Sequence, residues 1–425
     1  MTRPELLVLT GLHRSGVEAV IGRIRAVDPD AAVLHHDLSD IGSGRVHRRL
    51  RRGGLDETTV LDLEHGCLSC TLREDLLPQL LALAGPGGPR RIVLHLDPAL
   101  EPEQVCWSLL HVVVDGSDGP ITDVVDLRGV VAAVDAGHWL DDATGNETPA
   151  EHRGTAGGGA GGVGEHGLAE LPDDERTLAQ IAVGQAEFAD LLVHTGTADA
   201  WRLARTDAVL ARLAPAAQRL HLADLDARVL LADLPAAARR GRPDDVHAPL
   251  LRGEPPLCRD CGVEMLVFSA RRPFHPQRLH TAMDVVLEGV VRTRGRMWLA
   301  TRPEAVLWLE SAGGGLRVGH AGDWLADADA EVWESVSAER RAVAALGWDP
   351  DFGDRAQDLV VIAHDADLVE IEAALTGALL TDAELAAGQA AWRELPDPFG
   401  WWHTDPCESP ADLLSGPTGS ESEEH

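Results

Sequence analysis

Residues 5–21, ELLVLTGLHRSGVEAVI, decide the class of fold. The first six form a short, largely apolar run of the kind that becomes a buried parallel strand. Gly11 and Gly16 follow, and the residues after them enter a helical pattern. A strand, a glycine-containing turn and a helix in this order are the geometry of a phosphate-binding loop. The sequence therefore predicts an α/β fold with a mostly parallel sheet and flanking helices.

The same loop lacks two side chains on which nucleotide turnover depends. In a working loop a lysine meets the β- and γ-phosphates and a hydroxyl group holds Mg²⁺. Val17 and Glu18 stand at these positions, and all 37 basic residues of the chain are arginine. We therefore predict no nucleotide hydrolysis or a very weak one, with no nameable catalytic residue, although a nucleotide could still bind. The candidate cofactor-binding residues of this degenerate loop are Gly11, Arg14, Ser15 and Gly16.

A candidate metal site lies in residues 62–75, DLEHGCLSCTLRED. Cys67 and Cys70 form a C-x-x-C pair, and this spacing lets two thiolates reach one metal ion. Asp62 and His65 are close enough in sequence to complete or tune the site. The donor types favour Zn²⁺ as the bound ion.

A second C-x-x-C pair, Cys258 and Cys261, follows much later in the chain. The two pairs could form one four-cysteine zinc site if the fold brings them together. The second pair could instead form its own knuckle with a nearby Asp or His, or be an inert turn. The sequence leaves these alternatives open.

Two further polar clusters have a functional and a structural interpretation. His35, His36 and Asp37 end a predicted second strand, where they could be metal ligands or only polar residues at a strand end. Arg45–Arg52 is the one dense basic cluster, and Val46 and Leu50, four residues apart, predict a helix with one apolar face. Its arginines could bind phosphate or an acidic partner, or only be solvated.

Composition limits the classes of function. With 425 residues and 44% hydrophobic content, the chain can bury two cores. A net charge of -32 argues against broad nucleic-acid binding, although the local Arg45–Arg52 patch stays a candidate. No apolar run reaches membrane-spanning length and no signal peptide is evident, so we expect no membrane partner. Six cysteines, four of them in C-x-x-C pairs, fit thiol or metal chemistry in a reducing cytoplasm.

The chain divides into four predicted parts. Residues 1–238 form the nucleotide-type domain, with a flexible Gly-rich insertion at about 140–178. Residues 239–261 are a polar connector that ends in the second C-x-x-C pair, and residues 262–403 are a smaller α+β domain. Residues 404–425 are an acidic, Ser/Glu-rich tail that we expect to be disordered.

Nearly the whole sequence resembles the CobW family of P-loop GTPases with a CobW C-terminal domain. Residues 62–75 are similar to the family's E-x-x-N-G-C-x-C-C-T-x-R-x-D-L signature, with Asp62, His65 and Ser69 as the departures. Residues 129–136, GVVAAVDA, match a family strand, and residues 267–280, 289–303, 353–362 and 395–399 resemble its C-terminal domain.

The nucleotide motifs of the family are those that this sequence has lost. In the phosphate loop, Arg14 replaces a glycine, Val17 the lysine and Glu18 the Mg²⁺-binding threonine. Residues 95–99, HLDPA, lack the glycine of the second switch. Residues 189–197, ADLLVHTGT, align with the guanine-reading A-D-x-x-x-x-N-K-x-D motif without its asparagine and lysine. This pattern is typical of a pseudo-GTPase.

The resemblance implies zinc-linked functions. Typical members of the family are GTP-dependent zinc metallochaperones. The C-x-S-C form of the motif and the degenerate loop are similar to one actinobacterial branch, MRF, which recruits a hibernation factor to ribosomes when zinc is scarce. The leading hypothesis is such a recruitment protein, with the ribosome or a hibernation factor as partner. The alternatives are a GTP-dependent zinc metallochaperone and a zinc-storage or structural protein.

Overall fold

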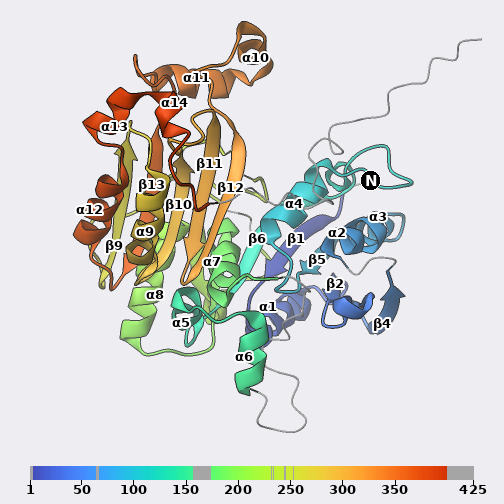
Figure 1. Cartoon of the computed structure of the whole chain (residues 1–425). Coiled ribbons are helices and arrows are strands. Elements are labelled where there is room, and N and C mark those ends of the chain that lie inside the picture. Colours follow the sequence, from blue (N-terminus) through green and yellow to red (C-terminus); the bar gives the residue numbers. More distant parts are fainter. Residues whose placement is uncertain are drawn as a thin grey trace, which may run out of the picture.

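The computed structural model describes residues 3–63, 67–156, 174–230, 232, 234–243, 246–251 and 253–399. They form two sheets, one in each half of the chain (Figure 1). The first has eight strands in the order β4-β3-β2-β5-β1-β6-β7-β8. Its parallel strands are β1 (Glu5–Thr10), β2 (Ala32–Asp37), β5 (Arg91–His95), β6 (Asp126–Asp135), β7 (Leu191–Thr195) and β8 (Gln218–His221). The predicted mostly parallel α/β sheet is confirmed.

Helices cover both faces of this sheet. The helix α1 (Arg14–Val27) packs on one face, where alternate residues of β1 meet Val17, Val20 and Ile21 in a buried cluster. The other face is covered by α3 (Leu77–Leu83) and α4 (Pro102–His111). Because β1 is buried on both faces, its sequence is continuously apolar rather than alternating.

The second sheet is antiparallel and has the order β12-β11-β10-β13-β9. Its strands are β9 (Val263–Ala270), β10 (Val290–Met297), β11 (Ala305–Ala312), β12 (Gly315–Asp323) and β13 (Gln357–His364). The helices α9 (Pro276–Leu287) and α12 (Leu368–Ala378) cover one face. The smaller α+β domain expected from the sequence is thus confirmed as a fold.

Two helices of the first half cover the other face of the second sheet. These are α7 (Leu178–Phe188), which lies between the sheets in Figure 1, and α8 (Ala200–Leu213), which contacts β9 and β13. In β13, Val360 and Ile362 join a hydrophobic cluster with α7 and α8, whereas Leu359 and Val361 point into the cluster with α9 and α12. One hydrophobic core therefore continues from the first sheet into the second.

The remaining helices are short. They are α2 (Leu68–Cys70), α5 (Trp139–Thr144), α6 (Pro149–Ala156), α10 (Ala330–Ser335), α11 (Ala338–Leu346), α13 (Asp382–Ala387) and α14 (Gln389–Trp392), with a π-helical turn at Thr71–Leu76 and 3-10 turns at Ile41–Ser43, Ile121–Asp123 and Leu222–Asp224. Within the described ranges, no helix has both the length and the apolar character to cross a membrane.

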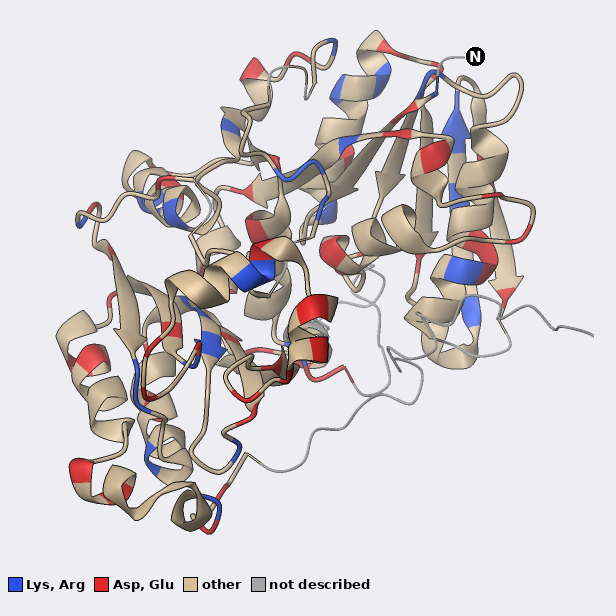
Figure 2. Cartoon of the chain, turned by 90° about the horizontal axis from the view of Figure 1, so that it is seen from above, with Lys and Arg blue, Asp and Glu red and all other residues tan. Residues whose placement is uncertain are grey.

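The helix predicted for Arg45–Arg52 is wrong, because this segment is strand β3, antiparallel to β2 and to β4 (Leu55–Asp62). Val46 and Leu50 lie four residues apart, and this spacing places them on one face of a strand as well as of a helix. Each of four arginines meets a carboxylate: Arg48–Asp75 at 2.6 Å, Arg49–Asp56 at 2.8 Å, Arg51–Glu18 at 2.8 Å and Arg52–Asp30 at 3.0 Å. Figure 2 shows basic and acidic positions intermixed along the ribbon.

The insertion predicted at about 140–178 begins with two short helices, α5 and α6, and ends where α7 begins. Helix α5 buries Trp139, Leu140 and Ala143, and the Trp139 indole N–H donates to the carbonyl oxygen of Ala182 at 3.3 Å. Helix α7 begins with a capping box in which the Thr177 hydroxyl accepts from the backbone of Gln180. Residues 157–173, with the Gly-rich stretch, and the tail at 404–425 lie outside the described residues.

Candidate functional site

The degenerate phosphate loop connects β1 to α1. The helix begins at Arg14, with His13 as its N-cap residue. The backbone N–H groups of Gly16 and Val17 donate to the carbonyl oxygen of His13, at 3.1 and 3.3 Å. In a phosphate loop such N–H groups surround the phosphate oxygens. Here they close the first turn of the helix.

The residue at the magnesium-binding position makes a different bond. Glu18 forms a bidentate ion pair with Arg51 of β3, with its two oxygens 2.8 and 3.0 Å from the guanidinium nitrogens. The Arg51 side chain is 10% exposed, so the pair is partly buried. Val17 is buried in the cluster between α1 and the sheet. The Glu18 carboxylate is therefore directed toward a strand rather than toward the loop.

The space in front of the loop is small. A cavity of about 20 Å³ remains there, whereas sites for small ligands typically have about 300 Å³ or more. The imidazole rings of His35 and His95 stack inside it, with centroids 4.1 Å apart. The cavity is lined by Gly11, Arg14, His35, Asp37, His95, Asp97 and Pro98.

Burial controls the charges around this cavity. It lowers the pKa of His35 to about 4, so the ring is neutral at pH 7, and it holds the pKa of His95 well below its usual value. Burial also raises the pKa of Asp97 to about 7. The Asp97 carboxylate nevertheless accepts backbone N–H bonds from Leu38 and Ala99, at 3.1 and 2.9 Å. These are fixed structural contacts.

His35, His36 and Asp37 do not act as one ligand group in this structure. They follow one another in β2, so the side chain of His36 points to the opposite face from the other two. His36 is 1% exposed, and its Nε2 lies 2.7 Å from a carboxylate oxygen of Asp75. In the described part of the chain they belong to no group of three metal-ligating atoms.

Cys67 and Cys70 lie on one helical turn. Cys67 is the N-cap of α2, and its sulfur accepts the backbone N–H of Cys70 at 3.3 Å. Both thiols are half-buried. Burial and the neighbouring Cys67 thiol raise the pKa of Cys70 to about 12, so a metal would have to displace its proton. The two sulfurs fit a thiolate-binding ion such as zinc.

Among the described residues, no other predicted ligand joins Cys67 and Cys70 in a group of three ligand atoms. Asp62 is an exposed residue at the end of β4. His65 lies outside the described residues. Cys258 is exposed and Cys261 half-buried, with the Cys261 sulfur 3.3 Å from Asp260. Across the residues that the structure describes, the four thiols form no common ligand group.

Asp75 ties the thiol segment to the sheet. It lies in the π-helical turn Thr71–Leu76 directly after Cys70, and such turns are frequent at functional sites. Besides His36, it accepts from Arg48 of β3 at 2.6 Å. The segment is thereby fixed to two strands of the sheet.

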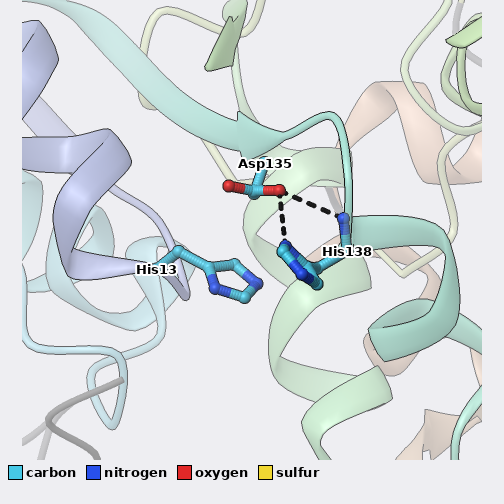
Figure 3. A group of neighbouring side chains, drawn as sticks. All are labelled: His13, Asp135 and His138. Atoms are coloured by element: carbon cyan, nitrogen blue, oxygen red, sulfur yellow. Dashed lines mark hydrogen bonds and ion pairs between the residues drawn. The ribbon is translucent and has the colours of Figure 1, made fainter. Parts of the chain in front are cut away.

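Sequence reasoning missed one group, formed by His13, Asp135 and His138 (Figure 3). One ligand atom from each lies within 4.8 Å of the others. His13 follows β1, Asp135 is the last residue of its parallel neighbour β6, and His138 lies three residues further on. The available signal was that both strands end at the same edge of the sheet.

Comparisons with known proteins match both halves of the chain. Residues 8–220 match the model described as CobW/HypB/UreG, nucleotide-binding domain. Residues 263–379 match the Cobalamin synthesis protein cobW C-terminal domain. The two matches fall on the two sheets.

Three proteins illustrate the similarity. A Mycobacterium tuberculosis protein named zinc chaperone Rv0106 is 44% identical over 417 residues, which are 97% of this chain and 96% of that protein. The zinc-regulated GTPase metalloprotein activator 1 of Dictyostelium discoideum is 26% identical over 80% of this chain and 70% of its own length. The solved structure of Zn(II)-bound YjiA GTPase from E. coli is 16% identical, covers 89% of this chain and 100% of its own, and has a TM-score of 0.36.

Proposed function

Since the chain belongs to the CobW family, we propose that it is a zinc-linked, GTPase-like protein that has given up nucleotide turnover and acts by recruiting a partner. The main support for the loss of nucleotide turnover is the bidentate ion pair between Glu18 and Arg51. It puts a carboxylate, already bonded to an arginine, where a magnesium-binding hydroxyl would be needed.

Two further features support the loss of turnover. The N–H groups of Gly16 and Val17 are bonded to His13 within the helix, so they cannot surround a phosphate without unwinding it. The cavity of about 20 Å³ in front of the loop is far below the volume that a nucleoside triphosphate requires. Binding of GTP would therefore require a rearrangement of α1 and of the stacked His35 and His95.

Zinc is the ion that we propose for Cys67 and Cys70. Two thiols at this spacing suit zinc, and His65 and Asp62 remain candidate ligands, of which the exposed Asp62 would have to approach the thiols. Cys258 and Cys261 are candidates for a separate site. Because binding releases thiol protons and orders the segment, zinc supply would change the conformation of residues 67–76.

The Asp75 contacts provide a way for this change to reach the rest of the domain. A shift of the turn after Cys70 would also displace His36 of β2 and Arg48 of β3, because both side chains are bonded to Asp75. A partner surface near these strands would thus be present in one metal state and altered in the other. We propose a hibernation factor or the ribosome as this partner, in the cytoplasm and under zinc limitation, on the resemblance of the motif to the MRF branch.

A second candidate function is a GTP-dependent zinc metallochaperone. It is favoured by the 44% identity, over 97% of this chain, to a protein named zinc chaperone. A third candidate is zinc storage without a responding partner, which requires only that the thiols bind the ion.

Zinc and Mg·GTP titrations of the metal-free protein separate these functions. The compared proteins are the wild type, Cys67→Ser/Cys70→Ser, and Cys258→Ser/Cys261→Ser, which tests whether the second pair binds an ion of its own. We expect the first double variant to lose a thiolate-bound zinc ion and no protein to bind GTP. Tight GTP binding with turnover would refute the pseudo-GTPase function and favour the chaperone. Co-sedimentation with ribosomes, with and without zinc, then tests recruitment. If zinc does not change the amount of protein that sediments with ribosomes, zinc storage is the function that remains.

A further inference from the structure

We infer that His13, Asp135 and His138 form a second, thiol-free binding site for a divalent transition-metal ion at the carboxyl ends of β1 and β6. The inference does not rest on the proposed recruitment function, because it concerns other residues and another donor chemistry. Figure 3 shows the His13 ring pointing across the loop ends toward His138, with Asp135 beside them.

The backbone brings the three residues together. Strands β1 and β6 are parallel neighbours, with Thr10 opposite Ala132, so the residues that follow them leave the sheet side by side. His13 lies three residues beyond β1, and Asp135 is the last residue of β6. The placement is therefore set by the sheet and not by a mobile surface loop.

The position of the Asp135 carboxylate is also fixed. Its Oδ1 accepts the backbone N–H groups of Gly137 and His138, at 2.9 and 3.1 Å. Gly196, at the end of β7, has a φ of 67°, and a Cβ there would lie 2.9 Å from Asp135 Oδ2. A glycine at this position therefore leaves room for the carboxylate. Gly196 stands at the position of the lost lysine when residues 189–197 are aligned with the guanine-reading motif.

The donor atoms are close to metal-binding distances. Tetrahedral Zn²⁺ with bonds of about 2.0 Å places its ligand atoms about 3.3 Å apart. The three atoms here lie within 4.8 Å of one another, and His138 Nδ1 is already 2.9 Å from Asp135 Oδ1. The side chain of His138 is 69% exposed, so its ring can turn to admit an ion without disturbing the core.

The donor set determines the kind of ion. Two imidazoles and one carboxylate suit Zn²⁺, Co²⁺, Ni²⁺ or Fe²⁺, and poorly suit Mg²⁺ or Ca²⁺, which prefer oxygen ligands. Three protein ligands leave at least one coordination position open, unlike the four protein ligands of a structural zinc site. This chemistry differs from the thiolates at Cys67 and Cys70.

A fourth residue positions one of the rings. Asp142 of α5 has its Oδ2 2.7 Å from His13 Nε2, and the two side chains are 13% and 8% exposed. Carboxylates bonded to metal-binding histidines orient the ring and raise its basicity. Asp142 is therefore a positioning residue of this site.

The test uses the full chain with all four C-x-x-C cysteines changed to serine, so that thiolate sites cannot contribute. Co²⁺ is added to the metal-free protein, and bound ion is measured by equilibrium dialysis and visible absorption. We expect one Co²⁺ per chain with a spectrum free of sulfur-to-cobalt charge transfer.

His138→Ala should weaken Co²⁺ binding at least tenfold. His320→Ala is the matched control, because His320 is also an exposed histidine beside an Asp three residues away, and it should change affinity less than twofold. No bound ion, or unchanged affinity in His138→Ala, would overturn the inference.

Asp142→Asn tests the positioning residue in the same background. We expect Co²⁺ affinity to fall about 10- to 100-fold, which is the usual effect of removing such a partner. Zn²⁺ competition against bound Co²⁺ should show the same loss. If Asp142→Asn lowers the melting temperature of the metal-free protein but leaves both affinities unchanged, Asp142 has only a structural role.

Discussion

The carboxylate of Asp75 lies 2.7 Å from Nε2 of the buried His36, so the turn that follows the first C-x-x-C pair is bonded directly to strand β2 of the first sheet. The same carboxylate is 2.6 Å from Arg48. One acidic residue thus joins the candidate zinc segment to β2 and β3. Its removal would leave a buried imidazole and a partly buried guanidinium without this partner.

Asp75→Ala should therefore destabilise the protein by about 2–4 kcal/mol, because the remaining polar groups lose a buried charged acceptor. Urea unfolding followed by circular dichroism measures the change. Glu74→Ala is the control, because Glu74 is the exposed neighbour on the same turn. If both variants have the same free energy of unfolding, Asp75 does not hold the turn to the sheet.

The Glu18–Arg51 pair should behave as a stabilising interaction in the fold. We expect Glu18→Ala and Arg51→Ala each to cost about 1–3 kcal/mol, and a double-mutant cycle to give a coupling of about 1–2 kcal/mol. Denaturant unfolding of the four proteins measures these values. A coupling near zero would mean that the carboxylate is not held by Arg51, and would weaken the explanation for the lost metal position.

Acid should destabilise the fold through the buried His35. In the unfolded chain the pKa of His35 is near 6.5, whereas burial lowers it to about 4 in the fold. The positive charges of His36 and Arg14 also lower this pKa, and the negative charge of Asp37 raises it. Protonation therefore favours unfolding. The contribution of neutral His35 is complete above pH 6.5 and is lost as the pH falls toward 4, by about 3 kcal/mol in total.

The variant His35→Phe, which keeps the stack on His95, isolates this effect. Its free energy of unfolding should fall less steeply than that of the wild type between pH 6.5 and 4. His320→Phe, at an exposed histidine, should follow the wild-type slope. Parallel profiles for wild type and His35→Phe would show that His35 titrates normally in the fold.

Glu187 of α7 forms a buried ion pair between the two halves of the chain. It lies 2.8 Å from Arg292 and 2.5 Å from Arg294, both in β10. Although burial raises the pKa of Glu187, the two guanidinium groups outweigh burial and hold that pKa below its usual value.

Glu187→Ala should accordingly destabilise the protein by about 3–5 kcal/mol, because two buried arginines lose a shared anion. Thermal unfolding measures the loss, and Glu339→Ala on the surface helix α11 is the control. A change below 1 kcal/mol would mean that the arginines find other partners.

The sequence predicted those parts of the fold that depend on local pattern. The apolar runs at β1, β5 and β13 gave their strands, and two cysteines three residues apart necessarily lie near each other. The segment Arg45–Arg52 was misassigned because its two apolar residues fit both periodicities, and only pairing with β2 and β4 decides between them.

Long-range placement could not be predicted in the same way. His13 and Asp135 meet only because β1 and β6 are neighbours in a strand order that differs from the order of the sequence. Helix α5 was missed because one turn with Trp139 and Leu140 carries little periodic signal. Its burial depends on α7, which comes later in the chain.

The core that runs through α7 and α8 limits how this protein can respond to an ion. Rotating one half against the other as a rigid body would open a hydrophobic cluster and separate Glu187 from its arginines. Such a hinge motion is therefore opposed by buried apolar contacts and by a buried ion pair. We therefore expect the zinc-dependent change that we propose to be a local opening at the edge of the first sheet, with fast exchange of backbone amides there and slow exchange in α7.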